Sequence, residues 1–275
     1  MKKFLVPTDF SDTSKNAARY AVQMAATIPD SRIILYNVYD KIAAGSDGSP
    51  LTESPEDRKI VLHHALKNLE IEISESTGVH MEFIAEEHSS LIEAMTRFVR
   101  HNGIDLVIMG ITGATRLEQI FMGSNTLNFI NEDVCPVIIV PPAAGFKKIE
   151  NVMFLSDFKD VSKSTPFDSI RKVLDLFKPV LHIVNVDTEH YIELTEEYKA
   201  ERAKLETMFQ AYSPQFYFMR LFDFLDAISS FTIDRNIDII VTVPRSHSFV
   251  TGLFKTSHTT KLAYHSHVPL VAVHE

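Results

Sequence analysis

The stretch 110–124 has the residue types and the spacing of a loop that binds phosphate. It reads G-x2-G-x9-G-S and follows directly on the apolar run 104–109. Gly110 and Gly113 let the backbone turn sharply off a strand and approach a ligand where a Cβ atom would clash, and the last Gly-Ser pair opens the next helix with free backbone N–H donors. The loop has no Walker lysine, so backbone donors would bind the anion.

This spacing resembles that of the universal stress protein family, in which the pattern marks the ATP-binding members. The resemblance also covers residues 4–11, which read FLVPTDFS, and the stretch 33–38, which reads IILYNV. It implies an α/β fold of the adenine nucleotide alpha hydrolase-like type, with strand order 3-2-1-4-5. In such a sheet ligands bind beyond the carboxyl ends of the strands where the winding reverses, here between strands 1 and 4. Asp9 ends strand 1 and Gly110 ends strand 4, so both belong to one crevice.

The resemblance implies that this crevice holds ATP, ADP or AMP, with Mg2+ bound through the phosphates. Asp9 would lie near the adenosine, and Val38 would offer backbone contacts to adenine. The glycines would run beside the ribose and the phosphates, and the start of the next helix would hold the phosphate tail. The residues expected to line the site are Pro7, Thr8, Asp9, Val38, Met109, Gly110, Thr112, Gly113, Arg116, Gly123, Ser124, Asn125 and Thr126.

The chemistry of these residues agrees with adenosine near Asp9 and phosphates near the helix start, although each residue also has a simpler explanation. A carboxylate such as Asp9 repels phosphate and suits hydroxyl or amino donors, whereas a helix start attracts phosphate. Arg116 can reach a terminal phosphate. Taken alone, Asp9 is better explained as a cap of the helix that begins near Asp12, the glycines as an ordinary turn, and Arg116 as a solvated cation. Their joint spacing in a strand-to-helix context favours nucleotide binding.

The chain contains one pattern twice. Asp9 aligns with Asp157 at an offset of 148 residues, and Asp105 aligns with Asp238 at an offset of 133. The first match runs without a gap to 37–38 on 185–186, and the second runs without a gap to 136–140 on 269–273. The join lies near 141–147, where Pro-Pro-Ala-Ala-Gly breaks both helical and strand patterns.

Within each half, short apolar runs alternate with helical patterns, which argues for parallel strands joined by crossover helices. The sequence therefore predicts two tandem doubly wound five-stranded parallel-sheet domains, at residues 1–143 and 148–275. Strands are expected at 3–8, 32–38, 80–86, 104–109 and 136–140, and again at 150–155, 179–186, 215–221, 238–243 and 269–273. Helices of the first half are expected at 12–27, 57–77, 89–101 and 124–132.

The last strand of each half, 136–140 and 269–273, carries no charge that would guard an exposed edge. The resemblance implies the same arrangement, because the last strands tend to meet in the two-domain assemblies of the universal stress protein family. We therefore expect these two strands to pair within one chain as a pseudo-dimer. Whether the whole chain also forms a homodimer stays open.

The second half has lost the glycine loop. Gly110, Gly113 and Gly123 are replaced by Val243, Ser246 and Thr256, and only Ser124 is kept, as Ser257. A β-branched valine stiffens the backbone, and the proline that follows it removes a donor. We expect no tight ATP site in this half. Residues 255–258 form either a weaker anion site or, as we prefer, only a polar helix start.

The composition bounds the partners and the compartment. Acidic residues outnumber basic ones by 36 to 27, and no block of Lys or Arg is visible, which disfavours nucleic acid and membrane surfaces as partners. The apolar run 4–6 is too short for a signal peptide, and no apolar stretch approaches the roughly 20 residues that span a bilayer. A cytoplasmic location is expected, and the single cysteine, Cys135, fits a reducing compartment.

These observations predict a nucleotide-binding regulatory protein of the stress response, in which ATP occupancy biases the shape of the protein or its choice of an unknown protein partner. No activated catalytic group and no metal-ligand spacing is recognised in the sequence, so an enzyme is not expected. Two alternatives stay open, a slow ATPase or phosphotransferase and a scaffold whose pocket stays empty.

Overall fold

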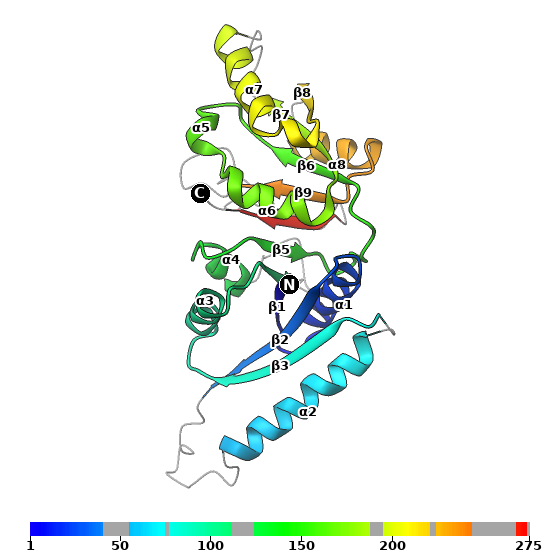
Figure 1. Cartoon of the computed structure of the whole chain (residues 1–275), viewed down its shortest axis with the longest axis vertical. Helices are drawn as coiled ribbons and strands as arrows, with labels where there is room; N and C mark the ends of the chain where they lie inside the picture. Colours follow the sequence, from blue (N-terminus) through cyan, green and yellow to red (C-terminus); the bar gives the residue numbers. More distant parts are fainter. Residues whose placement is uncertain are drawn as a thin grey trace.

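Strands and helices alternate along both halves of the chain (Figure 1). The computed structural model describes residues 1–40, 55–74, 77–111, 124–187, 195–220, 224–243 and 268–273. The first half contains β1 (Lys2–Pro7), α1 (Asp12–Ala26), β2 (Ser31–Tyr39), α2 (Pro55–Ile73), β3 (His80–Glu87), α3 (Leu91–Asn102), β4 (Leu106–Gly110), α4 (Ser124–Ile130) and β5 (Val137–Val140). The second half contains β6 (Asn151–Leu155), α5 (Val161–Ser164), α6 (Phe167–Phe177), β7 (Val180–Asp187), α7 (Glu196–Met208), a 3-10 turn (Gln210–Tyr212), β8 (Gln215–Arg220), α8 (Phe224–Asp234), β9 (Ile239–Thr242) and β10 (Leu270–Ala272).

The described strands form one ten-stranded sheet in the order β3-β2-β1-β4-β5-β10-β9-β6-β7-β8. The first five strands have the order 3-2-1-4-5 that the family resemblance implies, and the second five repeat it in the opposite direction across the sheet. All neighbouring pairs are parallel except β5 and β10, which are antiparallel. The α/β fold class is therefore confirmed.

The two halves meet along β5 and β10, as the sequence predicts for these two uncharged runs. Leu270 pairs with Ile139, Val271 with Ile138 and Ala272 with Val137. All six side chains are buried. Because each strand completes the edge of the other's sheet, neither apolar edge is left open to other chains.

Successive side chains of each strand point to opposite faces of the sheet, and they form a hydrophobic core on each face. Phe4 and Val6 of β1 point to one face, where they pack with Ala17 of α1. Leu5, between them, points to the other face and joins a second cluster with Met95 of α3. Both faces of β1 are thus covered, as expected for a parallel strand at the centre of a doubly wound sheet.

The turn after the first strand recurs in both halves. Phe10 has φ 64° and Phe158, 148 residues later, has φ 55°. The N–H of Phe10 donates to Thr8 Oγ1 at 3.0 Å, and the N–H of Phe158 donates to Ser156 Oγ at 3.2 Å. A positive φ is costly for an aromatic residue, so the hydroxyl two residues earlier holds the same strained turn in each half.

A second shared contact fixes this turn to the neighbouring strand. Asn37 Nδ2 donates to the carbonyl of Thr8 at 2.8 Å, and Asn185 Nδ2 donates to the carbonyl of Ser156 at 2.9 Å. The sequence repeat is therefore a structural repeat down to single hydrogen bonds.

The helix after the first strand differs between the halves. In the first half α1 is continuous, whereas in the second half it is divided into α5 and α6. Pro166 stands where the first half has Ala18, and proline lacks the N–H and crowds the preceding turn of a helix. The sequence analysis did not predict this division.

The segment that joins the halves is held by α1. Asn16 Nδ2 donates to the carbonyl of Pro141 at 3.0 Å and to that of Ala144 at 3.1 Å. The ring of Phe146 meets the ring of Tyr20 edge-on, with centroids 5.3 Å apart. Among the helices of the described segments, none is long and apolar enough to cross a lipid bilayer.

Candidate functional site

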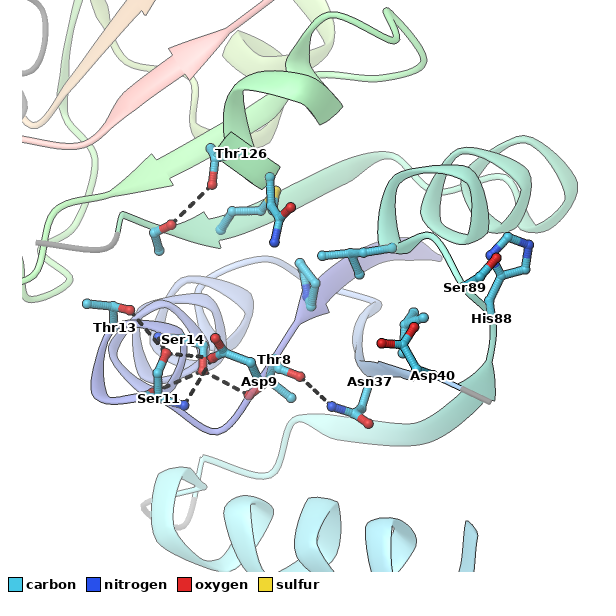
Figure 2. Close-up of a pocket in the computed structure, with 16 residues that line it drawn as sticks. Thr8, Asp9, Ser11, Thr13, Ser14, Asn37, Asp40, His88, Ser89 and Thr126 are labelled. Carbon is cyan, nitrogen blue, oxygen red and sulfur yellow. Dashed lines mark hydrogen bonds between the residues drawn. The ribbon is translucent and has the colours of Figure 1, made fainter. Parts of the chain in front are cut away.

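A cavity of about 430 Å³ opens at the carboxyl ends of β1, β2 and β4 (Figure 2). It lies where β1 and β4 are neighbours although they are distant in sequence, which is the point where the winding of the first half reverses. The predicted site residues that line it are Pro7, Thr8, Asp9, Val38, Met109, Gly110, Asn125 and Thr126.

The rest of the predicted set lies outside what the structure describes. Thr112, Gly113, Arg116 and Gly123 fall in the gap 112–123, and Ser124 begins α4 with a side chain that is not among the described ones. The structure thus brings together the strand-end residues of the prediction, and the glycine loop between β4 and α4 stays a sequence prediction.

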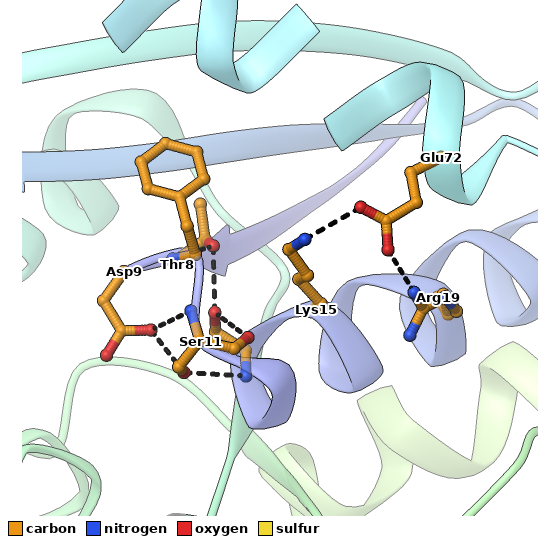
Figure 3. A network of polar contacts seen from close by, with 8 residues as sticks. Thr8, Asp9, Ser11, Lys15, Arg19 and Glu72 are labelled. Atoms are coloured by element: carbon orange, nitrogen blue, oxygen red, sulfur yellow. Dashed lines mark hydrogen bonds and ion pairs between the residues drawn. The ribbon is translucent and has the colours of Figure 1, made fainter. Parts of the chain in front are cut away.

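Asp9 holds the turn that leads from β1 into α1 (Figure 3). Its Oδ1 accepts a hydrogen bond from the N–H of Ser11 at 3.0 Å and one from Ser11 Oγ at 2.5 Å. Ser11, and not Asp9, is the N-cap of α1, because Ser11 Oγ accepts from the N–H of Ser14 at 3.3 Å. Asp9 therefore does not cap α1 itself, but orients Ser11, which does.

The same contacts set the charge of Asp9. Partial burial raises the pKa of its carboxyl group, but the hydrogen bonds from Ser11 and Ser14 together outweigh burial, so the pKa lies below its ordinary value. Asp9 is thus an ionised acceptor at neutral pH on the wall of the cavity.

Behind this turn α1 is tied to α2 by charge (Figure 3). Lys15 Nζ lies 2.9 Å from Glu72 Oε2, and Arg19 binds the other oxygen of the same carboxylate. The first turns of α1 are therefore fixed at the cap and on the outer face.

Gly110 is required for a reason that the sequence analysis did not anticipate. A Cβ atom on Gly110 would lie 2.4 Å from the carbonyl oxygen of Thr13 and 2.8 Å from its carbonyl carbon. The glycine therefore admits the first turn of α1 against the end of β4. In the second half the residue that aligns with Gly110 is Val243. The helix that corresponds to α1 is divided there, and its first part is the short α5.

The β4 end of the cavity is closed by the first turn of α4. Thr126 is buried, and its Oγ1 donates to the carbonyl of Gly110 at 3.3 Å. Asn125 is exposed and lines the cavity beside it. Among the described residues, the polar side chains that line this end are therefore uncharged.

A further group of lining residues was not predicted, and it comes from the ends of β2 and β3, from the N-cap and first turn of α1, and from the start of α3. The signal for some of them was present, because the carboxyl ends of neighbouring parallel strands share one edge of the sheet. The added residues are Ser11, Thr13, Ser14, Asn37, Asp40, His88, Ser89 and Leu91.

Two of these residues are held in place by the chain around them. Asn37 is 7% exposed, and its Nδ2 donates to the carbonyl of Thr8. Its Oδ1 is buried and finds no hydrogen-bond partner among the described residues. His88 Nδ1 lies within hydrogen-bond distance of both the N–H (3.0 Å) and the carbonyl (2.9 Å) of Ser90, the N-cap of α3. The ring of His88 is therefore positioned by its own loop.

The chemistry of the described lining is that of a binding site for a polar molecule. Its carboxylates are Asp9 and Asp40, and it contains neither Lys nor Arg. The described residues contain no group of three or more His, Cys, Asp or Glu side chains that could hold a metal ion. Cys135 lies outside the cavity, and burial raises the pKa of its thiol to about 12, which disfavours the thiolate that a nucleophile needs.

Comparison with known proteins places this geometry in a family. The model of the universal stress protein family matches residues 1–141. The curated universal stress protein MJ0531 of Methanocaldococcus jannaschii is 31% identical over 148 residues, which cover 50% of this chain and 81% of that protein. Universal stress protein MJ0577 of the same organism is 28% identical over 155 residues, which cover 50% of this chain and 94% of that protein.

A solved structure extends the likeness to the whole chain. A universal stress protein from Archaeoglobus fulgidus DSM 4304 superposes with a TM-score of 0.69 at 17% identity, covering 99% of this chain and 98% of that chain. At this identity the likeness shows the fold alone. The second half therefore shares the fold even though the family model matches only the first.

Proposed function

We propose that this chain, which belongs to the universal stress protein family, binds an adenine nucleotide in its first half and acts as a nucleotide-dependent regulatory protein of the stress response. The observation that carries the proposal is the cavity at the reversal point between β1 and β4, lined by the strand-end residues that the sequence selects. Its volume of about 430 Å³ suits a small ligand.

The polar groups of the cavity suit a nucleoside. The ionised carboxylate of Asp9 accepts from hydroxyl or amino donors and repels phosphate, so it favours the adenosine part of the ligand. The ligands we propose are ATP, ADP or AMP. Any Mg2+ would come with the phosphates, and the oxygen-rich lining fits that hard cation better than a softer metal.

We propose an unequal pair of domains, at residues 1–143 and 148–275, joined as a pseudo-dimer. The antiparallel pairing of β5 with β10 supports this arrangement. The replacement of Gly110 by Val243 and the division of the helix into α5 and α6 support the absence of a tight site in the second half. One nucleotide per chain is therefore expected, and its occupancy would govern the choice of a protein partner.

Binding is favoured over turnover. The described lining offers no Lys or Arg that would stabilise a transferring phosphoryl group. Of the two carboxylates in the described lining, Asp9 has a lowered pKa, and it already accepts hydrogen bonds from Ser11. We expect any ATP hydrolysis to be far slower than the typical enzyme rate of about 10 per second.

The test is calorimetry with ATP and Mg2+ on the full chain and on two matched variants. Asp9→Ala should weaken binding by about tenfold or more, because it removes a charged acceptor. Asp157→Ala is the matched control, since Asp157 Oδ1 accepts from the N–H of Lys159 at 3.1 Å in the same turn of the second half. It should leave affinity unchanged.

Two results would contradict the proposal. They are the absence of any bound nucleotide, or two equivalent sites per chain. A universal stress protein has been solved in complex with cAMP, so the titration should include that nucleotide as a separate ligand.

A further inference from the structure

The carboxylates of the cavity restrict how a nucleotide can lie in it. This step rests on the proposed function. Asp9 comes from the end of β1 and Asp40 follows the end of β2, and no Lys or Arg of the described lining neutralises either. A phosphate chain beside two carboxylates would be repelled. The phosphates therefore lie toward the β4 end, where Gly110, Asn125 and Thr126 line the wall.

The base must then occupy the opposite end of the cavity. The strand order β3-β2-β1-β4 separates the two ends by three strand spacings, about 14 Å, which is the scale of an extended nucleotide. At this far end the partly buried Val38 and Leu91 supply apolar surface against the core. Asp40 and His88 supply polar groups beside them. A base has apolar faces and a polar edge, and this mixture matches both.

Asp40 offers the one carboxylate of that end. Figure 2 shows it between the turn that holds Thr8 and Asp9 and the loop that holds His88 and Ser89. Its backbone carbonyl accepts a hydrogen bond from Arg58 at 3.1 Å, which fixes the chain at this position. No hydrogen bond or ion pair to its side chain is seen among the described residues. Asp40 is exposed, and among the described residues nothing occupies the acceptors of its carboxylate, so they can serve a ligand.

We propose that Asp40 accepts a hydrogen bond from the exocyclic amino group of the base and so determines the base specificity of the site. A carboxylate can only accept, so it stabilises an amino group and repels a keto oxygen at the same position. Asp40 selects adenine over hypoxanthine, which carries a keto oxygen where adenine carries the amino group.

The experiment compares the affinities of ATP and inosine triphosphate by calorimetry, in the unmodified chain and in Asp40→Asn. The two nucleotides have the same ribose and phosphates, so their affinity ratio cancels any general effect of charge or of folding. The unmodified chain should prefer ATP by about tenfold or more, the effect of one charged hydrogen bond. In Asp40→Asn the ratio should fall close to one, because an amide both donates and accepts. Asp133→Asn removes the same charge at an exposed residue that does not line the cavity, and asparagine also tolerates its φ of 50°. It should keep the ratio of the unmodified chain.

The outcomes separate this inference from the proposed function. If ATP binds but the ratio in Asp40→Asn equals that of the unmodified chain, the role of Asp40 is refuted and the nucleotide site stands. If neither nucleotide binds the unmodified chain, the proposed function fails and this inference fails with it.

Discussion

The contact between Gly110 and α1 makes a quantitative prediction about stability. In Gly110→Ala the new methyl group would lie 2.4 Å from the carbonyl oxygen of Thr13, whereas real Cβ atoms essentially never approach below 3.0 Å. The obstacle is backbone, so the first turn of α1 must move by at least about 0.6 Å, the difference between those two distances. That turn is held by the Ser11 cap and by the buried Ala17 and Ala18, so it cannot move freely.

Overpacking of this kind typically costs about 1–3 kcal/mol. The matched control is Gly145→Ala, because a Cβ atom there would meet nothing within 4 Å and the φ of Gly145 is not positive. Gly145→Ala should be neutral, or it should stabilise the fold by up to about 1 kcal/mol, because alanine lowers the conformational entropy of the unfolded chain. The assay is urea denaturation of the full chain, followed by circular dichroism.

The expected result is a lower unfolding midpoint for Gly110→Ala than for Gly145→Ala, with unchanged slope. Equal midpoints would refute the claim that Gly110 is required by α1. If Gly110→Ala keeps its stability and loses only nucleotide binding, the glycine serves the ligand directly, as the sequence analysis first held.

Three further predictions concern pH, the strand pairing and the cap. Burial, and after it a nearby arginine, lowers the pKa of His182, so the folded protein favours the neutral ring. The stability that this ring contributes should be fully present above the unfolded pKa of about 6.5 and should be lost as the pH falls below it. The difference between the urea midpoints at pH 7.5 and 5.0 should therefore be smaller in His182→Gln than in the unmodified chain. Val271→Lys places a charge at a fully buried position of β10 and should lower stability by at least about 3 kcal/mol in thermal unfolding, whereas Val180→Lys, at a side chain that is 42% exposed, should be near neutral; equal effects would contradict the buried pairing. Ser11→Ala removes the acceptor for the N–H of Ser14 and should cost about 1 kcal/mol, measured by urea denaturation, while Ser11→Thr should restore most of it.

The individual strands and the repeat could be predicted from the sequence because they depend on short apolar runs and on self-similarity. The strand order and the β5–β10 pairing are non-local, and they were predicted from the resemblance to the universal stress protein family, supported for the pairing by the absence of charge in 136–140 and 269–273. The division of the helix after β6 into α5 and α6 was not predicted, although Pro166 is visible in the sequence at the position that aligns with Ala18.

The candidate site was predicted from the glycine spacing and from the family resemblance. Asp40 and His88 belong to neither pattern, and they reach the cavity because β2 and β3 end at the same edge as β1. The role of Gly110 could not be read from the sequence either. It depends on the approach of Thr13, which lies almost a hundred residues away along the chain and is brought there by the sheet.

The union of β5 with β10 has a consequence for how the protein behaves on dilution. Two separate chains that met along such an edge would part as their concentration fell, because association follows mass action. Here both strands belong to one chain, so the partner is always present at a high effective concentration. The contact therefore does not depend on how much protein the cell makes.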